Sequence, residues 1–240
     1  MTSSPPDVAG RVQAVRERIA EAALRAGRDP AAITLVAASK TQPPERIAEV
    51  VRAGVRDVGE NRVQEARSKI PAVSAALHGL PGPTWHLIGH VQTNKAAAAA
   101  DLFQVVQSVD SVRVAEALSR RATRPLAVLL EVYVGDDPDR PGLRPAELSE
   151  AAGRIIELPH LNVRGLMSVA PLGLAAAEVR AAFAAIRNLR DSLAVEYPRV
   201  HWTDVSMGMT EDFPVAIAEG STMVRVGRAI FGERTLVEPA

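Results

Sequence analysis

The sequence predicts a single α/β domain folded as a (β/α)8 barrel, a TIM barrel, with an extra N-terminal helix. Eight short apolar segments alternate with segments of helical periodicity, at a spacing of about 20 to 40 residues. Of 240 residues, 47% are hydrophobic and only 3% aromatic, so Val, Leu, Ile and Ala must fill the core, as in buried parallel sheets. A doubly wound sheet with fewer strands is the alternative. No break in composition marks a boundary, so we expect one domain over 1–240, with 1–30 as N-terminal extension and helix.

The first two elements follow from local patterns. After an irregular start, Asp7 can cap a helix that runs to Ala26, because apolar residues recur at helical spacing and Gly27 is suited to end it. The first strand is predicted over 33–40, since a nearly continuous apolar run is typical of a strand buried on both faces. Similar runs predict the remaining strands at 56–60, 85–89, 103–109, 126–134, 162–169, 202–206 and 222–226.

The helices between these strands are predicted from start and stop residues. Pro43 and Pro44 favour a helix start and Gly54 a helix end, while the alanine run 96–100 favours helix over linker because alanine is the best helix former. The loop 135–145 is rich in Pro, Gly and Asp and precedes a helix that Pro145 starts. The predicted helices cover 44–53, 62–76, 95–100, 112–121, 145–157, 178–197, 211–219 and a last turn at 229–231.

Composition excludes several classes of function. Lys+Arg and Asp+Glu both number 28, and no basic run with interleaved aromatic residues occurs, so nucleic-acid binding is not indicated. The absence of cysteine excludes disulfides, thiolate metal sites and a cysteine nucleophile. Neither a signal peptide nor an apolar stretch of about 20 residues is present, so we expect a cytoplasmic protein. As a separate expectation, we take the protein to be a monomer.

Lys40 is the first candidate for chemistry. It ends the first predicted strand, and parallel strands release their last side chains at the edge where α/β folds bind ligands. A partly desolvated lysine can form a Schiff base with an aldehyde. The alternative is a solvated lysine at the start of the turn 40–44.

The ends of the last two strands could bind phosphate. Ser206-Met-Gly-Met-Thr210 offers hydroxyls and amides before a helix, and Gly227 and Arg228 follow the last strand. Two ordinary strand-to-helix turns would show the same residues, and spacing alone does not decide. Arg225 lies inside an apolar strand, where an unpaired charge is costly, so it needs an acidic or π-rich partner.

Six blocks of the sequence resemble the pyridoxal phosphate homeostasis protein family, whose members are similar to the barrel domain of bacterial alanine racemase. The resemblance extends from about Ile33 to Arg234. Its blocks are Ser39-Lys40-Thr41; Gly59-Glu60-Asn61 with Gln64-Glu65; Trp85-His86 through His90 to Gln92-Thr-Asn94-Lys95; Gly165-Leu-Met-Ser168; Ser206 to Thr210 with Asp212; and Val224-Arg225-Val-Gly227 with Gly232.

The resemblance implies a complete cofactor site. Lys40 would hold pyridoxal 5′-phosphate (PLP) as an internal aldimine, and Arg225 would face the pyridine nitrogen. Further contacts implied are to the phosphate, from Ser206 and the amides of Gly227 and Arg228, and to the ring, from Asn61 and His86.

The same resemblance limits the chemistry. An arginine keeps the pyridine nitrogen unprotonated, which makes the ring a poor electron sink. The family is regarded as carriers without established catalysis, so the expected function is to buffer PLP or deliver it to apo-enzymes. The alternatives are a slow PLP-dependent amino-acid racemase and a barrel without cofactor. Arg228 and Arg140 depart from the family pattern, which often has threonine or serine at the first position and lysine at the second.

Other binding sites are not predicted. His86 and His90 have no adjoining glutamate, so a zinc site is not expected, and His90 is expected to form hydrogen bonds in a loop. Lys95 is expected to face solvent. No glycine pattern for nucleotide cofactors occurs, and the three aspartates of the loop 135–145, Asp136, Asp137 and Asp139, do not fit the spacing of a calcium loop.

Overall fold

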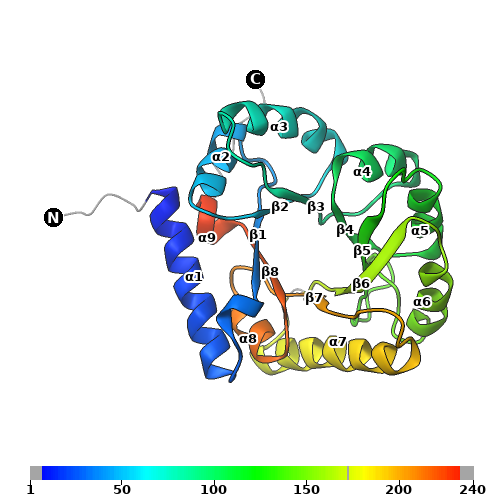
Figure 1. Ribbon diagram of the computed structural model, residues 1–240. Helices are drawn as coiled ribbons and strands as arrows, with labels where there is room; N and C mark the ends of the chain where they lie inside the picture. Colours follow the sequence, from blue (N-terminus) through cyan, green and yellow to red (C-terminus); the bar gives the residue numbers. More distant parts are fainter. Residues whose placement is uncertain (1–6, 172, 233–240) are drawn as a thin grey trace.

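The eight predicted strands form one closed parallel barrel in chain order, which confirms the TIM-barrel fold (Figure 1). The structure is a computed structural model that describes residues 7–171 and 173–232, so the irregular start predicted before Asp7 lies outside the described residues. Closure between the first and last strands excludes the doubly wound alternative. The strands are β1 Thr34–Ala38, β2 Asp57–Glu60, β3 Thr84–Leu87, β4 Val105–Val109, β5 Leu126–Glu131, β6 Leu161–Met167, β7 Asp204–Ser206 and β8 Met223–Val226.

Helices surround the barrel at the positions that the sequence predicts, with ends shifted by a few residues (Figure 1). Within the described residues, no helix combines the length and apolar character that crossing a bilayer requires. The helices are α1 Val8–Arg25, α2 Pro44–Arg52, α3 Val63–Ala76, α4 Ala96–Leu102, α5 Val112–Ser119, α6 Leu148–Ile156, α7 Ala176–Glu196, α8 Phe213–Ala218 and α9 Arg228–Phe231, with 3-10 turns η1 Pro30–Ala32 and η2 Thr93–Lys95.

Helix α1 lies outside the repeating units, against α8 and α9 (Figure 1). Asp7 caps it as predicted, because its Oδ1 accepts a hydrogen bond from the amide of Gly10 at 2.8 Å. Gly27 follows the helix with φ +66°, a backbone conformation that glycine adopts without steric cost. The apolar stripe of α1 packs against the outer face of β8 and the neighbouring helices. This helix therefore covers the outside of the barrel at its last strand. The buried residues of this cluster include Val12, Val15, Ile19, Phe213, Ile217, Val224 and Ile230.

Strand β5 ends earlier than predicted, and the reason is a tertiary contact. The prediction extends to 134, but the ladder to β6 stops at Glu131. Val132 instead pairs with Leu143, and the amide of Tyr133 donates to the carbonyl of Leu143 at 3.1 Å. The loop after β5 therefore folds back over the end of its own strand and forms part of the barrel mouth.

Gly165 allows β6 and β7 to approach closely. A Cβ atom built at this position would lie 1.7 Å from the carbonyl oxygen of Asp204, which no side chain can tolerate. The close approach aligns Met167 with Ser206 at the carboxyl ends of the two strands. This register fixes where along the barrel axis the segment after β7 begins, at the carboxyl end of the barrel.

Candidate functional site

Two adjoining cavities occupy the carboxyl end of the barrel. One has a volume of about 650 Å³ and is lined mainly by the segments after β1, β6, β7 and β8. The other has a volume of about 330 Å³ and is lined by the segments after β2, β3 and β5. Four residues line both cavities: Ala38, Lys40, Met209 and Arg225. The side chains of Lys40, Met209 and Arg225 therefore stand where the two cavities meet.

Lys40 follows the end of β1 by two residues and reaches this shared wall. Strand pairing continues one residue beyond β1, because the amide of Ser39 donates to the carbonyl of Gly59 at 2.9 Å. The whole sequence contains only three lysines, Lys40, Lys69 and Lys95. Of these, Lys40 alone lines either cavity.

The larger cavity has hydrogen-bond donors where the sequence predicts a phosphate cup. Within the described part of the chain, the backbone amides of Gly227 and Arg228 donate no hydrogen bond, and both residues line the cavity. At Gly227 a Cβ would stand 3.2 Å from the carbonyl oxygen of Ala38, so glycine keeps this approach open. The guanidinium of Arg228 turns aside to pair with Glu211 at 3.1 Å, which leaves its amide exposed to the cavity.

Arg225 brings a buried positive charge to the same place. It is 4% exposed, donates from Nη1 to Ser206 Oγ at 2.6 Å, and donates from Nη2 to the carbonyl of Ser168 at 2.8 Å. Burial lowers the pKa of Arg225 to about 10, although the charges of Glu131 and Asp212 oppose the change. The guanidinium therefore stays charged at neutral pH, and Glu131 and Asp212 are the acidic residues whose charges favour its protonated form.

A chain of buried hydrogen bonds crosses the barrel interior behind Arg225. Ser206 Oγ is 2.6 Å from Gln107 Oε1, Gln107 Nε2 is 2.9 Å from His86 Nδ1, and His86 Nε2 is 2.9 Å from Asp57 Oδ1. Arginine can only donate, so Ser206 accepts from Arg225 and donates to the Gln107 carbonyl oxygen. The Gln107 amide then donates to His86, whose remaining proton points to Asp57. This direction of donation makes His86 a neutral imidazole with its proton on Nε2.

The smaller cavity carries groups of both charges. Asn61, His90 and Glu131 line it, with Arg140 on the side of the loop after β5. His90 is a hydrogen-bonded loop residue, as predicted, because its Nδ1 is 2.6 Å from Asp110 Oδ2. Burial raises the pKa of Glu131 to about 7, Asp110 adds to the rise, and Arg225 opposes it. A carboxyl group that changes protonation near neutral pH therefore faces the space beside Lys40.

The comparisons with known proteins agree with this geometry. The family model for the N-terminal domain of alanine racemase matches residues 11–235. The pyridoxal phosphate homeostasis protein of Escherichia coli (strain K12) is 40% identical over 235 residues, which cover 95% of this chain and 97% of that protein. The chain belongs to the pyridoxal phosphate homeostasis protein family. The family member from Pseudomonas aeruginosa (strain PAO1) is 41% identical over 236 residues, covering 97% of this chain and 98% of that protein.

Solved structures place the family among related barrels. PipY of Synechococcus elongatus PCC7942, whose structure has PLP bound, is 42% identical with a TM-score of 0.79, over 91% of this chain and 100% of that one. Alanine racemase from Corynebacterium glutamicum is 18% identical with a TM-score of 0.65, over 95% of this chain and 63% of that one. The second likeness shows the shared barrel fold alone.

The residues that the family resemblance singled out occupy two layers. Lys40, Asn61, Arg225, Gly227 and Arg228 line the cavities. His86 and Ser206 do not line them, since both are buried in the hydrogen-bonded chain below the mouth. Their contacts to the ring and the phosphate stay predictions, and within the protein both residues belong to the hydrogen-bonded chain behind Arg225.

Sequence reasoning missed several polar residues of this site. Glu131 interrupts the apolar segment 126–134, the same signal that singled out Arg225, and could have been found in this way. No local sequence pattern marked Gln107 and Asp57 as site residues, because their hydrogen-bond partners lie 20 or more positions away in sequence. Among the described residues, no group of three or more His, Asp or Glu side chains is arranged to hold a metal ion.

Proposed function

We propose that the chain binds PLP in the two-cavity mouth, holds it as a Schiff base on Lys40, and buffers or delivers it to other proteins. The observation that carries the proposal is the shared wall, where a lysine amine and a buried guanidinium stand together between two cavities. The PLP in the structure of PipY, a protein 42% identical, supports the choice of ligand. Delivery to apo-enzymes, a monomeric state and a cytoplasmic location stay predictions.

The donor groups present fit this ligand. A phosphate needs several N–H donors, which the amides of Gly227 and Arg228 offer in the larger cavity. A pyridine nitrogen is a hydrogen-bond acceptor, and Arg225 offers a donor fixed by two hydrogen bonds. An aldehyde requires a primary amine, and Lys40 is the lysine that borders both cavities. Asn61 lines the smaller cavity and offers an amide donor for a ring substituent.

Holding and release use one reversible reaction. Lys40 would hold PLP through a C=N bond between its amine and the aldehyde carbon, with one water molecule released on binding and taken up again on release. Bound PLP supplies an electron sink, but a guanidinium facing the pyridine nitrogen donates a hydrogen bond without transferring its proton. Arg225 therefore favours retention of the ligand over carbanion chemistry. This is the physical reason to propose a carrier.

Trapping on lysine tests the proposal directly. The protein with PLP should develop a visible absorption band that borohydride bleaches, and peptide mapping should then place the label on Lys40 and not on Lys69 or Lys95. Lys40→Ala should abolish the band, while Lys95→Ala, which changes a lysine outside both cavities, should keep it. A label on Lys95, or a band that survives Lys40→Ala, would contradict the assignment.

A slow amino-acid racemase is the second candidate, because Glu131 lines the smaller cavity together with Lys40 and its pKa of about 7 suits proton exchange. If the protein is a racemase, incubation of the PLP-loaded protein with L-alanine and other L-amino acids yields the D-isomers over hours. We expect no sustained turnover. Turnover that Lys40→Ala abolishes would favour the racemase.

A further inference from the structure

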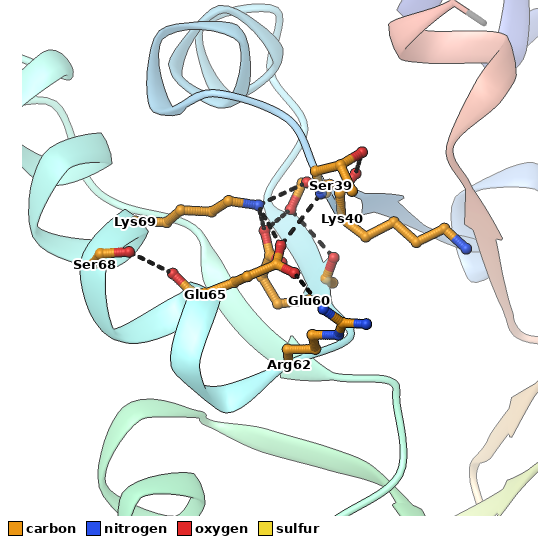
Figure 2. A network of polar contacts seen from close by, with 9 residues as sticks. Ser39, Lys40, Glu60, Arg62, Glu65, Ser68 and Lys69 are labelled. Atoms are coloured by element: carbon orange, nitrogen blue, oxygen red, sulfur yellow. Dashed lines mark hydrogen bonds and ion pairs between the residues drawn. The ribbon is translucent and has the colours of Figure 1, made fainter. Parts of the chain in front are cut away.

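A cluster of charged side chains, with Glu60 buried and Lys69 and Glu65 half-buried, lies beside the backbone next to Lys40 (Figure 2). Lys69, from α3, lies between two carboxylates: its Nζ is 2.9 Å from Glu60 Oε1 and 3.2 Å from Glu65 Oε2. Ser39 donates from Oγ to Glu60 Oε1 at 2.6 Å. Figure 2 shows the Lys40 side chain extending away from these groups, so the cluster acts on its backbone and not on its amine.

The cluster holds the chain on both sides of Lys40. On the preceding side, Lys69 Nζ donates to the carbonyl of Ser39 at 3.1 Å. On the following side, the amide of Thr41 donates to Glu65 Oε2 at 3.3 Å. The residues that flank the amine-bearing position are therefore tied to β2 and α3 by one connected set of hydrogen bonds.

Thr41 shows that this turn is held in an unfavourable conformation. Its φ is +65°, in the left-handed region that β-branched residues rarely adopt. Such a conformation persists only where the surrounding contacts determine it. Three contacts hold this turn. The Thr41 amide donates to Glu65, the Thr41 hydroxyl donates to the carbonyl of Lys40 at 2.6 Å, and the Gln42 amide donates to the carbonyl of Ser39 at 3.0 Å.

The cluster is costly to bury, which argues for a role beyond packing. Glu60 is fully buried, and its Oε2 has no hydrogen-bond partner among the described residues. Burial raises the pKa of Glu60, although Ser39 and Lys69 oppose the rise. Apolar residues of similar size would often fill such a place at equal or better stability. Unlike apolar residues, the charged cluster forms directional hydrogen bonds with two backbone groups beside Lys40, the carbonyl of Ser39 and the amide of Thr41.

We propose that Glu60, Lys69 and Glu65 are positioning residues that fix the left-handed turn at Thr41 and so direct the Lys40 amine to the wall shared by the two cavities. This rests on the proposed binding of PLP at Lys40. None of the three residues lines either cavity, so each acts through the backbone of residues 39–41.

The test compares PLP affinity with stability in matched variants. Titration of the apo-protein with PLP, followed by the visible band, should show Lys69→Met binding about tenfold more weakly, as expected when the turn must be ordered on binding. Lys95→Met, the same chemical change outside both cavities, should stay within about twofold of wild type. Urea denaturation of each apo-protein establishes that it is folded.

A rescue separates positioning from general loss of stability. Glycine adopts φ near +65° without strain, so Thr41→Gly in the Lys69→Met background should restore a large part of the affinity without needing the cluster. Should Lys69→Met fail to fold, Glu65→Ala removes the acceptor of the Thr41 amide, leaves the pair of Glu60 and Lys69 intact, and should weaken binding in the same direction.

Each outcome is decisive. A folded Lys69→Met or Glu65→Ala variant that binds PLP like wild type overturns the positioning role and leaves the proposed function standing. Weak binding that Thr41→Gly does not improve also overturns it. A wild-type protein that shows no visible band with PLP removes the proposed function, and this inference with it.

Discussion

Arg225 is a buried cation that is compensated at a distance and held by neutral partners. Its two hydrogen bonds go to a serine hydroxyl and a backbone carbonyl, while Glu131 and Asp212 balance its charge through space. The hydroxyl is fixed in turn by Gln107, and Gln107 by His86. A guanidinium so held cannot rotate without breaking buried hydrogen bonds, which gives the mouth a donor of fixed direction.

Replacing the middle of this chain should be costly. Gln107→Leu leaves the Ser206 hydroxyl proton without an acceptor and His86 Nδ1 without a donor. Each unsatisfied buried group costs about 1 to 3 kcal/mol, so urea denaturation should show a loss of roughly 2 to 6 kcal/mol. Gln104→Leu is the matched control; it removes a single acceptor of the Trp85 amide at an exposed position and should cost about 1 kcal/mol or less. Equal losses in the two variants would argue against a buried chain.

Glu131 should make stability depend on pH. Its ordinary pKa is 4.5 and the folded pKa is about 7, so between these values the folded state keeps a proton that the unfolded state has lost. The contribution of Glu131 to the free energy of unfolding is therefore fully present below pH 4.5 and is lost as pH rises to about 7. Glu131→Gln should exceed wild type by about 1 to 3 kcal/mol at pH 8 and by little at pH 4 to 5.

The measurement is the urea midpoint of the apo-protein across this range. Other titrating groups, including Asp110, His90 and Arg140 around Glu131, are present in both proteins, so the difference between them isolates the one carboxyl group. Glu147→Gln, at an exposed position, should show no such trend. A gap between wild type and Glu131→Gln that does not change with pH would show that the carboxyl group is not perturbed.

At the scale of elements, local patterns predicted every strand and the helices between them, because apolar runs, prolines and glycines act within a few residues. Strand ends were less well predicted. The segment 85–89 was expected as strand, but β3 is Thr84–Leu87. Where a strand ends depends on its pairing with neighbouring strands, and no local pattern specifies where that pairing stops.

The contacts that complete the site join residues of different structural elements. Glu60 meets Lys69 nine positions later, and Val132 pairs with Leu143 across a loop. No spacing rule for one helix or one strand predicts such pairs, since they depend on how β2, α3 and the loop after β5 are placed by the closed barrel. Local patterns singled out Lys40 and Arg225, and the family resemblance added Asn61, but neither predicted that Glu60, Lys69 and Glu65 contact one another beside Lys40.

For the whole molecule, the proposed ligand should raise thermal stability by mass action. PLP at about 100 times its dissociation constant adds about 2.7 kcal/mol to the folded state, which for a chain of this size corresponds to a rise in Tm of roughly 5 to 10 °C. The rise should grow with PLP concentration and shrink strongly in Lys40→Ala, because that variant keeps the phosphate donors but loses the covalent bond. Pyridoxal, which has the aldehyde but no phosphate, should give a smaller rise than PLP. If Lys40→Ala and wild type respond equally, the anionic group alone accounts for binding and the Schiff base has no part in it; if neither responds, the mouth does not bind PLP.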